Sequence, residues 1–294
     1  MQRYWYRILH LPFLTASALT FVFGTAIADY LGHSPVVWKV LLGTLTVWFI
    51  LGGSQILFEY FNRVNAGVAP FSLYEEKTDI EIPPPQTLLT VFIVLMTLAL
   101  AFGFGLTRNA ANVGLTILLL AGLLLSSVLF IGQPRLVYSG YGELVQGLIL
   151  CSFVPAFAFS LQSGEIHQLF LPVTFPLIFI FLAVSLALEL DSYAADLKQE
   201  RRTLLIRLSW QRGVILHHVL LLVGFILLAF APLFGVAWRL VWPALLALSV
   251  AVLEVWLVNR IALGLPPRWA LLKFTVWLAY MLPVYLLAIT FWMA

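Results

Sequence analysis

Nine long apolar segments, separated by short polar breaks, run through the 294-residue sequence. Roughly 20 mostly apolar residues are enough for a helix to cross a bilayer. Within lipid, only helices and closed barrels satisfy the backbone, and a barrel would give short alternating segments instead of continuous runs. The sequence therefore predicts an all-α, polytopic membrane helix bundle of about nine transmembrane helices, which forms a single domain over residues 1–294. The predicted spans are 11–31, 36–61, 87–106, 111–132, 142–162, 168–190, 213–233, 237–258 and 270–292.

The composition excludes an ordinary soluble domain, because 62% of the residues are hydrophobic and only 10% are charged. Soluble domains carry roughly 45–50% apolar and about 25% charged residues. The formal net charge of +3 is spread over many loops, and we expect no nucleic-acid partner. The single cysteine, Cys151, lies in an apolar run, so it is predicted to be a small buried hydrophobe that forms no internal disulfide.

The distribution of Lys and Arg predicts the orientation of the chain. With nine spans, all but three of the 16 Lys and Arg residues fall on the side of the N-terminus, and the exceptions are Lys39, Arg108 and Arg239. Loops with an excess of basic residues stay in the cytoplasm. We therefore expect an integral protein of a bacterial-type cytoplasmic membrane, with its N-terminus inside and the polar segments 62–86 and 191–212 on the cytoplasmic face.

Polar residues gather where the second predicted span ends. Gln55, Glu59 and Asn62 are spaced four and three residues apart, so they share one helix face, and Arg63 follows directly. A charged group at the centre of a bilayer costs roughly 2.5–3.5 kcal/mol on insertion scales, so charged residues within a span need a reason. This helix end is one half of a candidate site.

A second polar cluster follows the sixth predicted span. Glu189, Ser192, Tyr193 and Asp196 lie on one helix face, with Asp191 to the side. The basic residues that follow are Lys198, Arg201 and Arg202. A magnesium-bridged diphosphate needs such a set, because hard oxygen ligands hold Mg²⁺ and basic groups neutralise phosphate oxygens. The alternative is a helix end that meets lipid headgroups.

Three stretches of the chain have a distinctive order and spacing. They are LHLPFLTASALTFVFGTAIA at residues 9–28, PRLVYSGYGELVQGLILCSFVPAFAFSLQSGE at residues 134–165, and the stretch from Asp196 to Leu208 with its Arg202-Thr203-Leu204 and Arg207-Leu208. Together they resemble the UbiA superfamily of intramembrane prenyltransferases. The second stretch is similar to the menaquinone-type branch, the 1,4-dihydroxy-2-naphthoate polyprenyltransferases.

This resemblance implies a mechanism. Members have nine helices around a cavity, and two aspartate-rich motifs bind Mg²⁺ and the diphosphate of a polyprenyl donor. The diphosphate leaves, and an aromatic acceptor attacks the allylic cation. The catalytic residues implied here are Glu59, Asn62, Asp191 and Asp196, of which Glu59, Asp191 and Asp196 would bind the metal. The residues implied for diphosphate binding are Arg63, Lys198, Arg201 and Arg202.

The aspartate motifs differ from the family pattern. At the four motif positions of the first helix end, the chain has Phe58, Glu59, Asn62 and Ala66, and at the second motif it has Ser192 and Asp196. This depletion keeps open a second hypothesis, a catalytically degenerate relative that binds an isoprenoid or a quinone. A small-solute transporter also fits the helix number, but the sequence has no inverted repeat or broken helix pair.

Three ionisable residues lie in later spans. The adjacent His217 and His218 are predicted to be an interfacial pair, because neighbouring helical positions point about 100° apart. Glu254 is predicted either to line the cavity or to reach the membrane interface.

Overall fold

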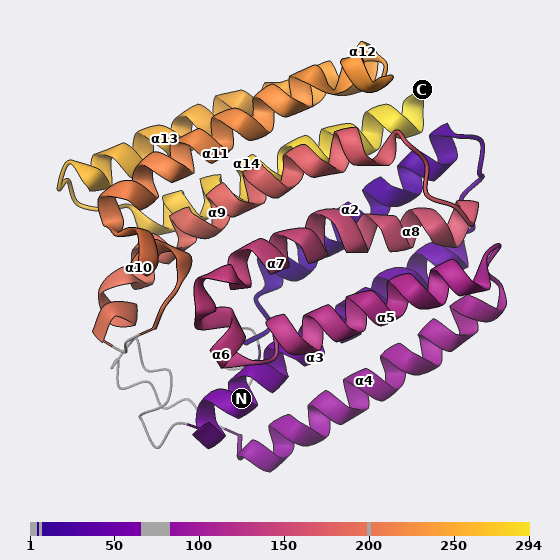
Figure 1. Cartoon of the computed structure of the whole chain (residues 1–294), viewed down its shortest axis with the longest axis horizontal. Helices are drawn as coiled ribbons and strands as arrows, with labels where there is room; N and C mark the ends of the chain where they lie inside the picture. The colour runs from indigo at the N-terminus through magenta and orange to yellow at the C-terminus, as the bar shows by residue number, and fades with distance from the viewer. Residues whose placement is uncertain (1–4, 6–7, 66–82, 199–200) are drawn as a thin grey trace.

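The computed structural model describes residues 5, 8–65, 83–198 and 201–294, which contain helices and loops but no strand (Figure 1). In this part of the chain nine helical segments are long and apolar enough to cross a membrane, so the prediction of a polytopic helix bundle is confirmed. The helices are α2 (Leu11–Tyr30), α3 (Val37–Asn65), α4 (Pro85–Arg108), α5 (Val113–Phe130), α6 (Pro134–Leu136), α7 (Gly142–Leu148), α8 (Val154–Ser163), α9 (Phe170–Lys198), α10 (Leu204–Leu208), α11 (Trp210–Phe230), α12 (Trp238–Val241), α13 (Leu248–Ala262) and α14 (Trp269–Met293). Shorter π and 3₁₀ turns join some of them, namely η1 (Val137–Tyr141), η2 (Ile149–Phe153), η3 (Ala231–Phe234) and η4 (Trp242–Ala247).

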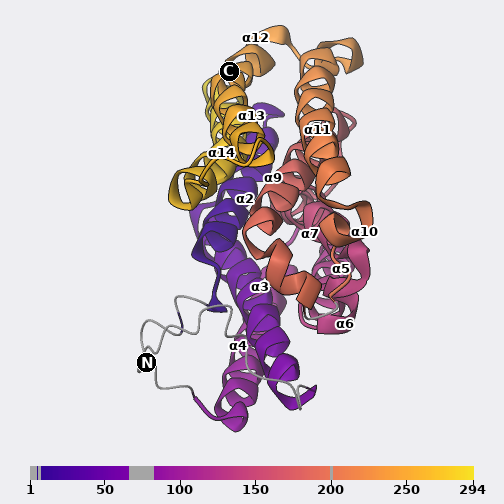
Figure 2. The ribbon, with the colours of Figure 1, turned by 90° about the vertical axis from the view of Figure 1, so that its left-hand side faces the viewer.

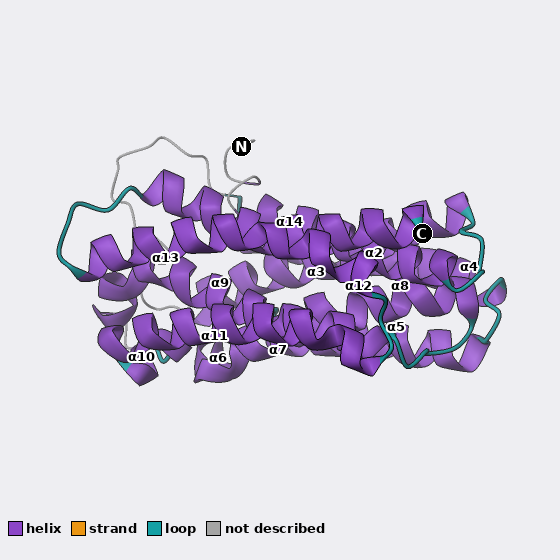
Figure 3. Cartoon of the chain, turned by 90° about the horizontal axis from the view of Figure 1, so that it is seen from above, coloured by secondary structure: helices purple, strands orange, loops and turns teal. Residues whose placement is uncertain are grey.

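The long helices lie side by side and form an elongated bundle (Figure 3). Helix α2 packs against α3, α8 and α14, while α9 packs against α7, α11 and α14. Helices α3 and α9 finish at the same end of the bundle, where α6 and α10 also lie (Figure 1). We call this the polar end, and Figure 2 looks onto it.

Burial separates the inner helices from the outer ones. In α2, 67% of the most apolar membrane-spanning stretch is buried inside the protein, against 22% in α4 and in α5. Because an exposed apolar helix surface is stable only against lipid, α4 and α5 present most of their surface to the bilayer. The most buried spans are α2, the fifth span with α8, α3 and α9, which form the centre of the bundle with α14.

The fifth span is irregular at two places. It begins with the π turn η1, and a second π turn, η2, ends at Phe153, two residues before Pro155. Proline cannot donate an amide hydrogen to the preceding turn, so the helix widens there. Gly24 of α2 lies so close to this segment that an added Cβ would come within 2.2 Å of the Pro155 carbonyl oxygen. Close packing of α2 against α8 thus depends on the absence of a side chain at Gly24.

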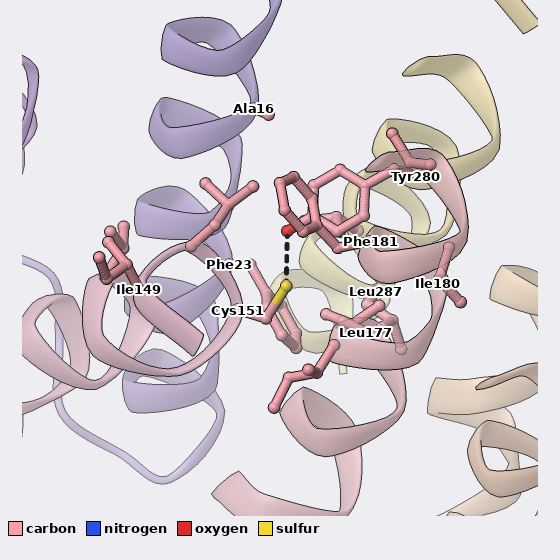
Figure 4. Packing of buried hydrophobic residues seen from close by; sticks show 14 of the residues in the cluster. Ala16, Phe23, Ile149, Cys151, Leu177, Ile180, Phe181, Tyr280 and Leu287 are labelled. Carbon is pink, nitrogen blue, oxygen red and sulfur yellow. Dashed lines mark hydrogen bonds between the residues drawn. The ribbon is translucent and has the colours of Figure 1, made fainter. Parts of the chain in front are cut away.

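The core beside η2 contains the single cysteine (Figure 4). Cys151 Sγ and Tyr280 Oη lie 3.2 Å apart in a hydrogen bond between η2 and α14, and the rings of Tyr280 and Phe181 meet edge to face at 5.5 Å. Cys151 is completely buried, which confirms the prediction for this residue.

The structure corrects the predicted loop over residues 191–212. Helix α9 continues to Lys198, and residues 204–208 form the short helix α10. The continuation carries charged residues, but Asp191 and Asp196 each find a cationic partner there. In the other predicted loop, residues 66–82 with the acidic Glu75, Glu76, Asp79 and Glu81 lie outside the described residues.

Candidate functional site

The end of α3 carries an ion pair within a single helix. Arg63 Nε donates to Glu59 Oε1 at 2.8 Å, one helical turn apart. Arg63 Nη1 also donates to the backbone carbonyl of Pro83 at 2.9 Å, just before α4 begins. The two side chains are only 14% and 12% exposed, so the pair lies partly inside the polar end.

The end of α9 carries a second carboxylate with an arginine. Ser192 Oγ donates to Asp196 Oδ2 at 2.6 Å, and Arg201 Nη1 donates to Asp196 Oδ1 at 2.8 Å. The Arg201 amide also donates to the Asp196 carbonyl at 3.0 Å, which turns the chain back after the helix. Both oxygens of the buried carboxylate therefore have charged or polar donors.

Tyr138 of η1 connects the two helix ends. The Arg201 guanidinium lies over its ring, 4.6 Å from the centroid, within the range of a cation–π contact. Its hydroxyl lies close to the side chain of Asn62 and within reach of the charges of Asp196 and Glu59. The structure thus gathers Glu59, Asn62, Asp196 and Arg201 around one tyrosine, although the second and sixth spans are far apart in the sequence.

Gly140 allows the basic segment after α9 to approach η1. Its φ of +78° lies in the left-handed region, which glycine adopts without steric cost. A Cβ at this position would come within 2.5 Å of Arg207 Cδ and 3.1 Å of the Arg202 carbonyl oxygen. Arg207 itself lies over the Tyr141 ring at 5.3 Å. The segment 201–208 is therefore packed directly on η1.

A buried carboxyl pair lies beneath this segment. The carboxyl groups of Glu143 of α7 and Glu189 of α9 lie close together. Glu143 Oε1 accepts the Leu204 amide at 3.2 Å, and Glu189 Oε2 accepts the Leu205 amide at 3.1 Å. The two carboxyls thus bind the first turn of α10.

Three of the predicted site residues form no described contact with Tyr138. Asp191 forms an ion pair with Lys273 of α14. Lys198 and Arg202 are exposed at the polar end. The metal role of Asp191 and the diphosphate role of Lys198 and Arg202 stay predictions, and Asp191 would have to exchange its Lys273 partner to take up that role.

The donor set fits a magnesium ion that arrives with its substrate. Among the described residues, no group of three or more His, Cys, Asp and Glu side chains is placed to hold a metal ion. Mg²⁺ bound to phosphates, however, often takes only one or two carboxylates from the protein and keeps several waters. Glu59 and Asp196 provide two carboxylates near Tyr138. The chemistry therefore suits a magnesium–diphosphate complex better than a resident ion.

A separate polar pair lies deeper in the bundle. His217 Nε2 of α11 and Glu254 Oε1 of α13 are 2.9 Å apart, and their side chains are 1% and 0% exposed. This corrects the prediction that His217 is interfacial. It also places Glu254 inside the protein, where the pair ties α11 to α13. His217 Nδ1 and Glu254 Oε2 have no hydrogen-bond partner among the described residues.

Sequence reasoning missed the Glu143–Glu189 pair, the central position of Tyr138 and the His217–Glu254 contact. The Gly-Glu pair in the fifth span marked Glu143 as unusual, because a carboxylate there is costly within a span. No sequence signal indicated the partner of Glu143, because the Leu204 amide, whose hydrogen bond Glu143 accepts, lies 61 residues away in the chain.

Proteins of known structure share this architecture. No protein-family model and no curated protein matches the sequence. The structure is similar to that of a digeranylgeranylglyceryl phosphate synthase in membranes, with a TM-score of 0.62 at 14% identity over 98% of this chain and 97% of that chain. It is also similar to the apo structure of a UbiA homolog from Aeropyrum pernix K1, with a TM-score of 0.64 at 13% identity over 93% of this chain and 96% of that chain. The protein therefore has a UbiA-like fold, which confirms the fold implied by the sequence resemblance.

Proposed function

We propose that this protein is a membrane-embedded prenyltransferase that moves a polyprenyl group from its diphosphate to an aromatic acceptor. The observation that carries the proposal is the cluster around Tyr138, in which Glu59, Asp196 and Arg201 come together at one end of a UbiA-like bundle. The digeranylgeranylglyceryl phosphate synthase that shares this fold supports a prenyl substrate.

The two ion pairs suit an exchange of partners when substrate binds. Each arginine now neutralises a carboxylate, Arg63 at Glu59 and Arg201 at Asp196. A magnesium diphosphate offers a cation to each carboxylate and phosphate oxygens to each guanidinium. Arg is well suited to this exchange, because its planar fork binds phosphate as readily as carboxylate. In this proposal Lys198 and Arg202 form an outer ring of positive charge.

The proposed reaction proceeds by separation of charge between the allylic carbon and the diphosphate. The bond between the allylic carbon and the diphosphate oxygen breaks, and the electron pair leaves with the diphosphate. Arg63 and Arg201 stabilise the charge that develops on the leaving group. When bound, Mg²⁺ would add further neutralisation of the same oxygens. A ring carbon of the acceptor attacks the allylic cation and then loses its proton to solvent.

The Tyr138 ring is placed to face a cation. Its π face now holds the Arg201 guanidinium at 4.6 Å. If Arg201 turns toward the diphosphate, the ring becomes available to the allylic cation, which an aromatic face also attracts. We propose a naphthoate as the acceptor, on the resemblance of residues 134–165 to the menaquinone-type branch.

One observation favours a second candidate, a degenerate relative that binds an isoprenoid or a quinone. The family's aspartate motifs supply several carboxylates, whereas here Asp191 is occupied by Lys273, and of the described carboxylates Glu59 and Asp196 lie near Tyr138. Such a protein would keep the fold without turnover.

A transfer assay separates the two candidates. Purified protein in lipid nanodiscs is incubated with labelled polyprenyl diphosphates of several lengths and with naphthoate or hydroxybenzoate acceptors, with Mg²⁺ or with EDTA. The proposed function requires Mg²⁺-dependent formation of a prenylated acceptor. Binding of isoprenoids or quinones without any transfer would establish the degenerate relative instead.

The orientation of the chain is also a proposal. On the distribution of Lys and Arg, the polar end faces the cytoplasm and the N-terminus lies inside. Cysteine labelling of Ser34 and Ser163, which lie toward the other end of the bundle, tests this in whole cells. An outside-only reagent should label both, and labelling only after lysis would reverse the orientation.

A further inference from the structure

The carboxyl pair of Glu143 and Glu189 has no role in the transfer chemistry described above. Both carboxyls instead bind backbone, because each accepts an amide of the segment that follows α9. Glu143 is buried, and its Oε2 has no hydrogen-bond partner among the described residues. The pair is therefore a buried set of acceptors between α7 and α9.

Two oxygens of this pair bind the start of α10. The amides of Leu204 and Leu205 donate to Glu143 and Glu189 at 3.2 and 3.1 Å. The Thr203 hydroxyl lies beside Glu189 and accepts the Ile206 amide at 3.5 Å. The first three amide groups of the helix, which have no partner within it, are thus all satisfied.

Helix α10 needs this support because it is only five residues long. Isolated helices shorter than roughly 12–15 residues are marginal in water, since nucleation is costly. The carboxyl pair holds α10 against both α7 and α9. Arg201 and Arg202 precede the helix directly, and Arg207 lies within it.

We propose that Glu143 and Glu189 are positioning residues that hold the segment 201–208, and with it Arg201, over the diphosphate site. The catalytic consequence of this inference rests on the proposed function, whereas its structural consequence does not. A glutamine at either position keeps a side-chain oxygen of the same size, so it can still accept the backbone amide.

Hydrogen–deuterium exchange on the full chain in nanodiscs tests the structural part. We expect the amides of 204–206 to be protected in the wild type and in Glu143→Gln. In Glu143→Ala and Glu189→Ala they should exchange about tenfold faster, since each loses a buried hydrogen-bond partner. Glu165→Ala, at an exposed glutamate on the opposite end, is the matched control and should change nothing. Equal exchange in the alanine and wild-type proteins would overturn the proposal.

The transfer assay tests the catalytic part. The alanine variants should raise KM for the polyprenyl diphosphate about tenfold while kcat changes little, and Glu143→Gln should restore the wild-type KM. If an alanine variant fails to fold, Thr203→Val removes one contact to the pair and should give a smaller rise in KM of the same kind. A wild type without transfer activity would remove the proposed function but leave the exchange result to decide this inference. Faster exchange at 204–206 with an unchanged KM would overturn the positioning role.

Discussion

The ends of α3 and α9 both present a carboxylate beside an arginine, but they are held in different ways. At α3, Glu59 and Arg63 are one turn apart on the same helix, and the further contact goes to Pro83. At α9, Arg201 returns from beyond the helix end to bind Asp196. The segment after Arg201 is then bound by η1 and by the Glu143–Glu189 pair. The α9 side is built by contacts among several elements, whereas the Glu59–Arg63 pair itself is formed within a single helix.

This difference suggests a division of labour. Contacts from several elements fix the position of Asp196 before substrate arrives, and a fixed group stabilises developing charge without reorganisation. The Glu59–Arg63 pair, in contrast, is set by the spacing of one helical turn. We therefore expect losses on the α9 side to be more damaging than losses on the α3 side.

The largest effect is expected for Asp196→Ala. It removes the buried carboxylate and leaves Arg201 without this partner, so transfer should fall at least about 100-fold. Folding should suffer less, because the residue lies in the last turn of α9 and the segment after it is also held by contacts to η1 and to the Glu143–Glu189 pair. The measurement is kcat/KM for the polyprenyl diphosphate, with thermal unfolding in parallel. Near wild-type activity would mean that the site is elsewhere.

Glu59→Ala should have the next largest effect, a loss of about tenfold in kcat/KM. Asn62 and Arg63 remain beside the site, and the α9 side is untouched. Glu59→Gln keeps the size of the side chain, so it separates the effect of losing the charge from the effect of losing the packing. A loss greater than that of Asp196→Ala would reverse the proposed division between the two helix ends.

Gly140→Ala should act through geometry. A left-handed residue with a side chain costs roughly 1–2 kcal/mol, and the new methyl group would collide with Arg207 and the Arg202 carbonyl. We expect a lower melting temperature and a several-fold higher KM. Gly32→Ala is the control, because its φ of +90° carries the same strain but its added Cβ meets no neighbouring atom. Equal effects on KM would show that close packing of segment 201–208 is unimportant.

Asp191→Asn should have the smallest effect. Its Lys273 partner is 49% exposed, and exposed ion pairs contribute little, so kcat/KM should change less than about threefold. Lys273→Met provides the reciprocal change. A loss comparable to that of Asp196→Ala would support the sequence-based assignment of Asp191 as a metal ligand.

The sequence predicted the nine spans well, because the length of an apolar run is set directly by bilayer thickness. It also predicted that Asp196 and Glu59 end their helices, since helical spacing is a local property. It did not predict the partners of Asp191 and Asp196, because Lys273 and Arg201 reach them only through the packing of the folded chain. The His217–Glu254 contact spans 37 residues and depends on how α11 packs on α13, which no local pattern encodes.

The most direct test of the central claim is the binding of a slowly cleaved polyprenyl thiodiphosphate to protein in nanodiscs by calorimetry. The wild type is compared with Asp196→Asn, each with Mg²⁺ and with EDTA, and Asp191→Asn is the matched control. We predict tight binding to the wild type and to Asp191→Asn only with Mg²⁺, and a loss of Mg²⁺-dependent binding in Asp196→Asn. Equal affinity with EDTA, or Mg²⁺-dependent binding that Asp196→Asn retains, would contradict a magnesium–diphosphate site around Tyr138.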